Sequence, residues 1–324
     1  MKKVVSFTKV VKEEVSLYEG WEVADYRALL SSFIKINGHL LLRNNEWLIF
    51  IRSENIKVAK LIIKLLKKLY PESQQRIIIS EKKKLRVNSD NKVVNIEVQN
   101  GVKEILKELA IYSEEKGFTL LPAMSYFKNM EMRKAYLAGA FLASGSVNSP
   151  QTKNYHLEIA VETKTLATYL QRLLKKFYLE AKLIKRRKQI VVYLKKSDQI
   201  ADFLKMIGAW NSLLHYEGIR IQRDQYNSLN RLYNCEIANE RRALEKGNEQ
   251  AALIDWYASK IGLEKLDPPL RIVAEARLSN PDATYLELTD YIRKNKGVSL
   301  SKSGLSYRLT KLINELETLK GIRK

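Results

Sequence analysis

The side chains best suited to do chemistry in this chain are cations gathered in two short segments. They are Lys82, Lys83, Lys84 and Arg86 in one segment, and Lys185, Arg186, Arg187 and Lys188 in the other. Both segments have the pattern of β-hairpins, and a two-stranded ribbon fits the major groove of DNA. Lysine and arginine in such a ribbon would contact phosphates and release counterions. We therefore predict that both hairpins bind a nucleic-acid backbone; the alternative is two exposed, charged turns without a ligand.

The overall charge favours the same kind of partner. The chain has 57 lysine and arginine residues against 36 aspartate and glutamate residues, a formal net charge of +21. Such an excess indicates a polyanion, which is DNA, RNA or an anionic membrane surface. Membrane binding would need a basic helix with a broad apolar face, or an apolar run of about 18 residues, and the basic residues concentrate in hairpins instead. We expect double-stranded DNA and no membrane; a merely solvated, highly charged surface is the alternative.

Groups that could hold a metal or a cofactor are few and scattered. His39, His156 and His215 show no spacing typical of metal ligands. Cys235 is the single cysteine, so neither an intramolecular disulfide nor a cysteine zinc cluster is possible, and a reducing cytoplasm is the simplest compartment. We expect no metal and no cofactor.

Two segments share a pattern of small residues ending in glycine. They read YLAGAFLASGS over Tyr136–Ser146 and LSSFIKING over Leu30–Gly38. Both resemble the LAGLIDADG helix of homing endonucleases, in which an acidic residue just before the last glycine binds the metal that drives DNA cleavage. Ser144 and Asn37 occupy that position here, and neither is the carboxylate that a magnesium site needs. The resemblance implies a nuclease scaffold without catalytic residues.

Small side chains on one side of each motif helix would let the two helix backbones approach closely. They are Ala28, Ser31 and Ser32 in the first helix, and Ala135, Ala138, Gly139 and Ala143 in the second.

The sequence after the two motifs also repeats. LLKKLY at Leu65–Tyr70 matches LLKKFY at Leu173–Tyr178, an offset of 173 − 65 = 108 residues. A repeat this long indicates a duplicated domain rather than a solenoid; two unrelated amphipathic helices are the alternative. We predict an α+β fold with two αββαββα halves, at about 21–115 and 125–217, preceded by a helical arm at 1–20.

Several elements of the halves can be bounded from their patterns. The first hairpin is expected to turn at Asn44-Asn45, because asparagine tolerates left-handed backbone geometry. We predict helices at Val102–Ser113, Met130–Ala143 and Ala201–Ile207. Strands are predicted at Lys182–Arg186 and Gln189–Leu194, with Arg187 and Lys188 at the turn between them.

The remaining residues predict a helical linker and an all-α domain. Residues 218–263 are polar and have few glycines, which indicates one or two connecting helices. Over 264–324, Pro268 suits a helix start, Thr284–Glu287 is a capping-box pattern, and Ser301 caps a third helix. Two short helices, a turn at Gly297 and an amphipathic helix form the helix-turn-helix arrangement.

In that arrangement the start of the third helix enters the major groove, where hydroxyl and cationic side chains suit base edges and phosphates. The residues expected to do so are Lys302, Ser303, Ser306, Tyr307, Arg308 and Lys311. The alternative is a three-helix bundle used for protein contacts.

Joined together, these features closely resemble the WhiA family of bacterial regulators over nearly the whole chain. The resemblance is carried by Arg133–Val147, Tyr155–Glu158, Asn230–Glu236 and Ser301–Leu309. It implies a non-enzymatic DNA-binding transcriptional regulator of cell division, chromosome segregation or sporulation, cytoplasmic and associated with the nucleoid. It also implies that the motif helices pair at a pseudo-twofold axis beneath a DNA-facing saddle of two sheets. An active homing endonuclease or RNA maturase, and a scaffold that binds partner proteins through the saddle, are the alternatives.

Overall fold

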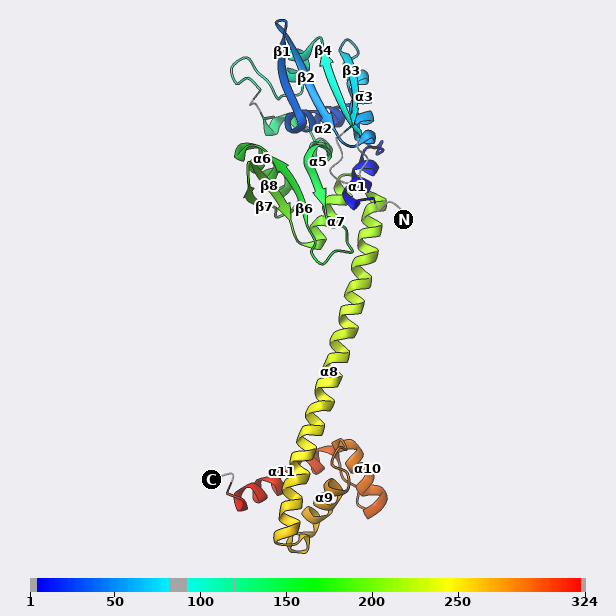
Figure 1. The fold of residues 1–324 in the computed structure, drawn as a ribbon, viewed down its shortest axis with the longest axis vertical. Helices are drawn as coiled ribbons and strands as arrows, with labels where there is room; N and C mark the ends of the chain where they lie inside the picture. Colours follow the sequence, from blue (N-terminus) through cyan, green and yellow to red (C-terminus); the bar gives the residue numbers. More distant parts are fainter. Residues whose placement is uncertain (1–4, 82–91, 119–120, 322–324) are drawn as a thin grey trace. The chain divides into compact units, whose positions relative to one another are not determined.

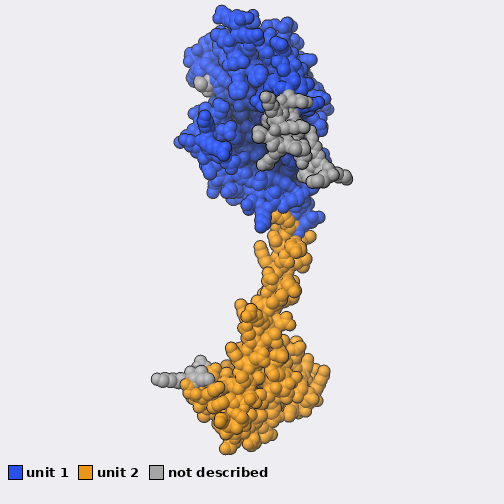
Figure 2. All heavy atoms as spheres, in the orientation of Figure 1, with its two compact units in different colours: residues 1–222 blue, residues 223–324 orange. Residues whose placement is uncertain are grey.

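The computed structural model describes residues 5–81, 92–118 and 121–321, which form two compact units, Met1–Gln222 and Arg223–Lys324 (Figure 2). The first contains two mixed α/β halves, and the second is helical. A single helix, α8 (Trp210–Lys260), passes from one unit into the other, where the sequence predicted one or two helices beginning later.

The first half has the predicted order αββαββα. Its elements are α2 (Val23–Asn37), β1 (Gly38–Arg43), β2 (Glu46–Ser53), α3 (Ile56–Leu69), β3 (Gln74–Glu81), β4 (Lys92–Gln99) and α4 (Val102–Glu108). The strands form an antiparallel sheet of order β1-β2-β4-β3. Asn44 and Asn45 take positive φ angles of 52° and 65° at the predicted turn, between the paired residues Arg43 and Glu46.

The second half repeats this order. Its elements are α5 (Met130–Ser144), β5 (Gly145–Val147), β6 (Leu157–Val161), α6 (Lys164–Lys175), β7 (Lys182–Arg186), β8 (Gln189–Leu194) and α7 (Ser197–Met206). The sheet order β5-β6-β8-β7 matches that of the first sheet. A short 3-10 helix, Met124–Tyr126, precedes α5. The predicted α+β fold with two αββαββα halves is confirmed.

Two predicted boundaries are wrong. Helix α4 ends at Glu108 rather than Ser113, because Ala110 has a φ of 55° that an α-helix cannot contain. Helix α7 begins at Ser197, four residues before the predicted start, and Asp198 lies in its first turn, where a negative charge favours the helix dipole.

The two motif helices pack directly against each other between the sheets (Figure 1). Every predicted small residue of this contact is buried apart from Ala143, which is partly buried. A Cβ built on Gly139 would lie 2.2 Å from the carbonyl oxygen of Leu29 and 2.2 Å from Ser32 Oγ. The backbone of α5 therefore reaches the backbone of α2, as the small residues predicted.

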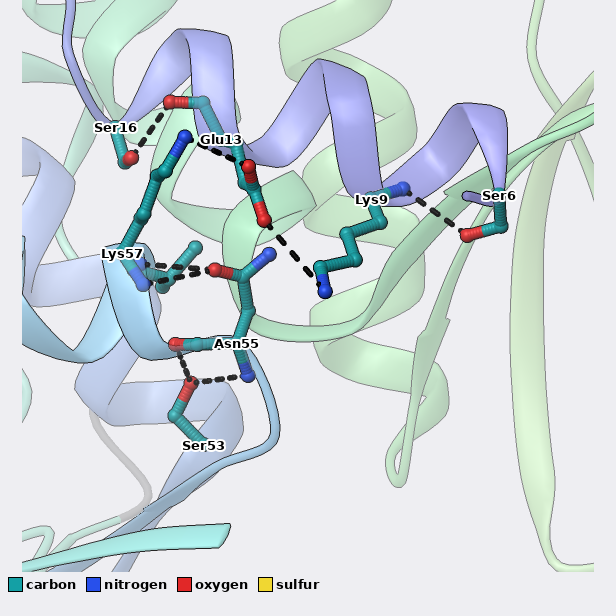
Figure 3. Close-up of polar contacts among 8 residues, drawn as sticks. Ser6, Lys9, Glu13, Ser16, Ser53, Asn55 and Lys57 are labelled. Carbon is teal, nitrogen blue, oxygen red and sulfur yellow. Dashed lines mark hydrogen bonds and ion pairs between the residues drawn. The ribbon is translucent and has the colours of Figure 1, made fainter. Parts of the chain in front are cut away.

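Helix α1 (Phe7–Val15) holds several elements of the first unit together (Figure 3). Glu13 Oε2 lies 2.8 Å from Nζ of Lys57 in the first turn of α3. Thr8 Oγ1 donates to the carbonyl of Val147 in β5 at 2.8 Å and accepts from its N–H at 2.9 Å. Both Glu14 carboxylate oxygens accept hydrogen bonds at the start of α8, from the N–H groups of Asn211 and Ser212. The arm thus contacts both halves and caps the long helix.

The second unit packs three helices against the end of α8. They are α9 (Pro268–Ser279), α10 (Tyr285–Lys296) and α11 (Lys302–Leu319), preceded by a 3-10 helix at Leu263–Lys265. Leu253, Ile254 and Tyr257 of α8 are buried against Leu270 of α9 and Leu312 of α11. The last turns of α8 therefore belong to the core of this unit.

Replacing Gly139 with alanine should destabilise the first unit by about 1–3 kcal/mol, because the added methyl would overlap the α2 backbone. Gly218→Ala is the matched control. It also lies in a helix, meets no atom within 4 Å, and should stabilise by up to about 1 kcal/mol. Hydrogen exchange in urea measures the protection of the α2 and α5 amides, which should be lower in Gly139→Ala than in Gly218→Ala. Equal protection in both variants would contradict the packing described.

Candidate nucleic-acid interface

The two motif positions that would carry metal-binding acids hold neutral side chains at the ends of α2 and α5. Asn37 Nδ2 donates to the backbone carbonyl of Arg52 at 2.6 Å, so its amide is used within the fold. Ser144 Oγ is buried and has no hydrogen-bond partner. Each helix ends at its glycine, whose N–H still bonds back to Ile34 or Phe141. Neither end presents a carboxylate.

The nearby acids are engaged elsewhere. Glu131 lies in the first turn of α5, at the opposite end from Ser144, and pairs with Lys134. Glu158 Oε2 on β6 lies 2.9 Å from His156 Nε2 and 3.3 Å from Arg186 Nη1. Across residues 5–81, 92–118 and 121–321, no group of three or more His, Cys, Asp or Glu side chains is placed to hold a metal ion.

Two lysines approach the C-terminal ends of the motif helices instead. Lys35, two residues before Asn37, donates a hydrogen bond to the Phe118 carbonyl, and its Nζ is 4.6 Å from the centroid of the Phe118 ring. Lys12 of α1 lies over Phe141, three residues before Ser144, at 5.8 Å from the ring centroid. Burial lowers the pKa of each ammonium to about 8.

The two basic hairpins differ in what can be described. Lys82, Lys83, Lys84 and Arg86 lie outside the described residues. In the second hairpin, Arg187 and Lys188 form the two-residue turn, and Arg187 has a φ of 55°. Lys185, Arg186, Arg187 and Lys188 are all exposed.

Strand alternation sends neighbouring cations of this hairpin to opposite faces of the sheet. Arg186 reaches Glu158, so both lie on the outer face, opposite the face that Ile159 buries against the helices. Lys185 then lies on the same side as Ile159, beyond the edge of the core. The sequence predicted these four cations as one contact group; strand alternation places Arg186 on the outer face and Lys185 on the opposite one, with Arg187 and Lys188 in the turn between the strands.

Helix α11 presents a polar face away from its own core. Leu305, Leu309, Leu312 and Leu316 are buried, and Ser301 caps the helix as predicted, accepting from the Gly304 N–H at 3.1 Å. Of the six residues predicted to read DNA, Lys302, Ser303, Tyr307 and Lys311 are exposed, and Tyr307 is 72% exposed. Ser306 and Arg308 are half-buried beside the core stripe.

Thr310 belongs to the same exposed face but is not among the six residues predicted from the sequence. It follows Ser303 and Tyr307 at spacings of seven and three residues, the spacing of one helix face. That spacing was visible in the sequence and could have identified it.

None of the helices in the described residues is long and apolar enough to cross a membrane.

Comparison with known proteins covers the chain in three consecutive parts. The model of the WhiA N-terminal LAGLIDADG-like domain matches residues 24–112, and that of the WhiA LAGLIDADG-like domain matches residues 133–226. The model of the WhiA C-terminal helix-turn-helix domain matches residues 229–315. The helix-turn-helix match therefore begins within α8, as the core of the second unit does.

Full-length relatives agree with these matches. A probable cell division protein WhiA from Brevibacillus brevis is 36% identical over 312 residues, 96% of each chain. Another from Lactobacillus acidophilus is 36% identical and spans 98% of this chain and 100% of its own. The crystal structure of full-length WhiA from Thermatoga maritima superposes with a TM-score of 0.58 at 25% identity, covering 97% of this chain and 99% of that one.

The lowered pKa values of Lys12 and Lys35 predict that the free energy of unfolding rises between pH 8 and 10. In that window the unfolded chain, with lysines near 10.5, binds more protons than the folded chain, so raising the pH favours folding. Each lysine contributes at most about 1.4 kcal/mol per pH unit. Urea titrations across this window should show that the free energy of unfolding rises less with pH in Lys12→Met and in Lys35→Met than in the wild type. The exposed Lys60→Met serves as control, and a slope equal to wild type in both buried-site variants would refute the prediction.

Proposed function

The chain belongs to the WhiA family, and from that membership we propose that it is a DNA-binding transcriptional regulator of cell division that does not cleave DNA. The observation that carries the proposal is the polar outer face of α11, mounted on a helix-turn-helix core. A helix of this kind inserts its first turns into the major groove and reads base edges there.

The residues of this face have complementary tasks in the proposal. Ser303, Tyr307 and Thr310 can hydrogen-bond to base edges or phosphates through their hydroxyls, and Lys302 and Lys311 supply positive charge for phosphates. Arg308 is half-buried, so we assign it to the backbone at the margin of the groove. Sequence preference then depends on the second unit.

The first unit would add affinity without much sequence preference. Arg187 and Lys188 at the tip of the β7–β8 hairpin are exposed cations suited to phosphate contacts. With Asn37 and Ser144 at the former acid positions, nothing there activates water or neutralises a leaving oxygen, contributions normally worth several kcal/mol. We therefore favour DNA binding over the endonuclease and maturase alternatives.

The cellular role in this proposal follows the relatives, whose names include cell division. Regulation of chromosome segregation or sporulation, and association with the nucleoid in the cytoplasm, are part of the same proposal. Mapping the genomic sites bound by the tagged protein would supply the target sequence used below.

Alanine at Ser303 and Tyr307 together should weaken binding to the mapped target by about 1–3 kcal/mol for each base pair that the helix no longer reads, with little effect on unrelated DNA. Both side chains are exposed, so folding should be unaffected. Fluorescence anisotropy with target and scrambled duplexes gives the ratio of the two dissociation constants, which measures sequence preference. Arg231→Ala, an exposed change on α8, is the control, and an unchanged ratio in the double variant would show that another element reads the sequence.

Replacing Arg187 and Lys188 with alanine tests the saddle separately. For each DNA phosphate that the variant no longer neutralises, the slope of log K against log salt concentration should become shallower by about 0.9. Arg186 is kept because it pairs with Glu158. A slope and affinity equal to wild type would instead favour the scaffold alternative, in which the saddle binds proteins.

A further inference from the structure

A cavity of about 710 Å³ opens in the second unit, where α8 passes the helix-turn-helix. Its volume is within the range of small-molecule sites. One wall comes from α8, the opposite wall from the α9–α10 turn and the start of α10, and Lys302 of α11 completes it. Apart from Lys302, none of the lining residues is assigned to DNA binding above.

Gly247 lets α8 lie directly on the opposite wall. A Cβ at this position would lie 2.3 Å from the Pro281 carbonyl oxygen and 3.1 Å from Arg277 Nη1. Gln250 Nε2, one turn later, bonds to Tyr285 Oη at 3.2 Å. The two walls are therefore held in contact at one end of the cavity, which is a formed part of the unit.

Arg277 is an unusual lining residue because its side chain is buried, with the whole residue only 1% exposed. Its Nη1 donates to the Asn280, Pro281 and Ala283 carbonyls, and the Tyr285 ring lies 5.6 Å away. Its Nε has no partner, and no carboxylate among the described residues pairs with it. Burial lowers the pKa of the guanidinium, because its charge is only partly compensated.

Counted together, the charged side chains of the lining have a net positive charge. The cationic side chains are Arg242, Lys246, Arg277 and Lys302, and the acidic ones are Glu236 and Glu240. Four positive against two negative charges give +2, the charge that a phosphate group would balance. Ala243, Leu286 and the Tyr285 ring add apolar surface beside them.

We propose that this cavity binds a small phosphorylated molecule, with its phosphate among the cations and its organic part on Ala243, Tyr285 and Leu286. The phosphate supplies the negative charge that Arg277 lacks. The apolar lining favours a ligand with a planar or apolar group over inorganic phosphate alone. Nucleotides belong to this chemical class.

A ligand bound in this cavity would weaken DNA binding. This consequence rests on the proposed function. Lys302 is the first residue of α11 and one of the predicted phosphate contacts, and it also lines the cavity. A ligand phosphate and a DNA phosphate would compete for the same ammonium. The ligand would therefore act as a negative effector.

Isothermal titration of the full-length chain with ADP and with pyrophosphate, in the absence of DNA, tests the site. We expect saturable binding of at least one probe, weakened at least tenfold by Lys246→Glu and by Lys302→Glu. Arg231→Glu makes the same charge change on α8 outside the cavity and should leave binding unaffected. Adenosine, which lacks phosphate, should bind far more weakly than ADP.

The absence of saturable binding by both probes at millimolar concentration would overturn the site, as would equal weakening in Lys246→Glu and Arg231→Glu. A second titration measures DNA affinity with and without the bound probe. An unchanged DNA affinity would overturn the effector role alone. Because the first titration contains no DNA, its result holds even if the DNA-binding proposal fails.

Discussion

The contact between α2 and α5 is the constraint on which the first unit depends. Gly139 brings the two backbones together, and Ser31 and Ser32 can be buried there because their hydroxyls bond to the Leu109 and Leu29 carbonyls. Each helix runs straight into a strand, at Gly38 and at Gly145. One helix pair therefore determines where both sheets begin, so a change at this contact displaces both halves together.

This constraint also explains why the motif persists without its acids. The small residues are needed to pack the helices, whereas Asn37 and Ser144 occupy positions that packing does not specify. Asn37 has acquired a structural hydrogen bond, while the Ser144 hydroxyl has none. The fold can thus keep the helix packing of a nuclease-like centre without acids at these two positions, because the packing depends on other residues.

The parts of the structure that could be predicted from the sequence depend on local pattern. The turn at Asn44-Asn45, the β7–β8 hairpin and the buried stripe of α11 follow from backbone preference and periodicity. Features set by distant residues were predicted only in outline: the order αββαββα includes a strand after the second motif helix, but the three residues of β5 are defined by their pairing with β6. The cavity could not be foreseen, since it depends on how closely Gly247 lets α8 approach Pro281. The DNA contacts of Lys82, Lys83, Lys84 and Arg86 stay a prediction, because these residues lie outside the described ones.

The contacts of α1 have a consequence for the order of events during synthesis. Glu14 emerges early, yet its hydrogen-bond donors at Asn211 and Ser212 lie 197 and 198 residues later, and the Thr8 partner Val147 lies 139 residues later. Closing such long loops costs entropy before the contacts form. The arm can therefore complete these contacts only after the second half and the start of α8 have been synthesised. They join the arm to β5 and cap the first turn of α8 at the same time.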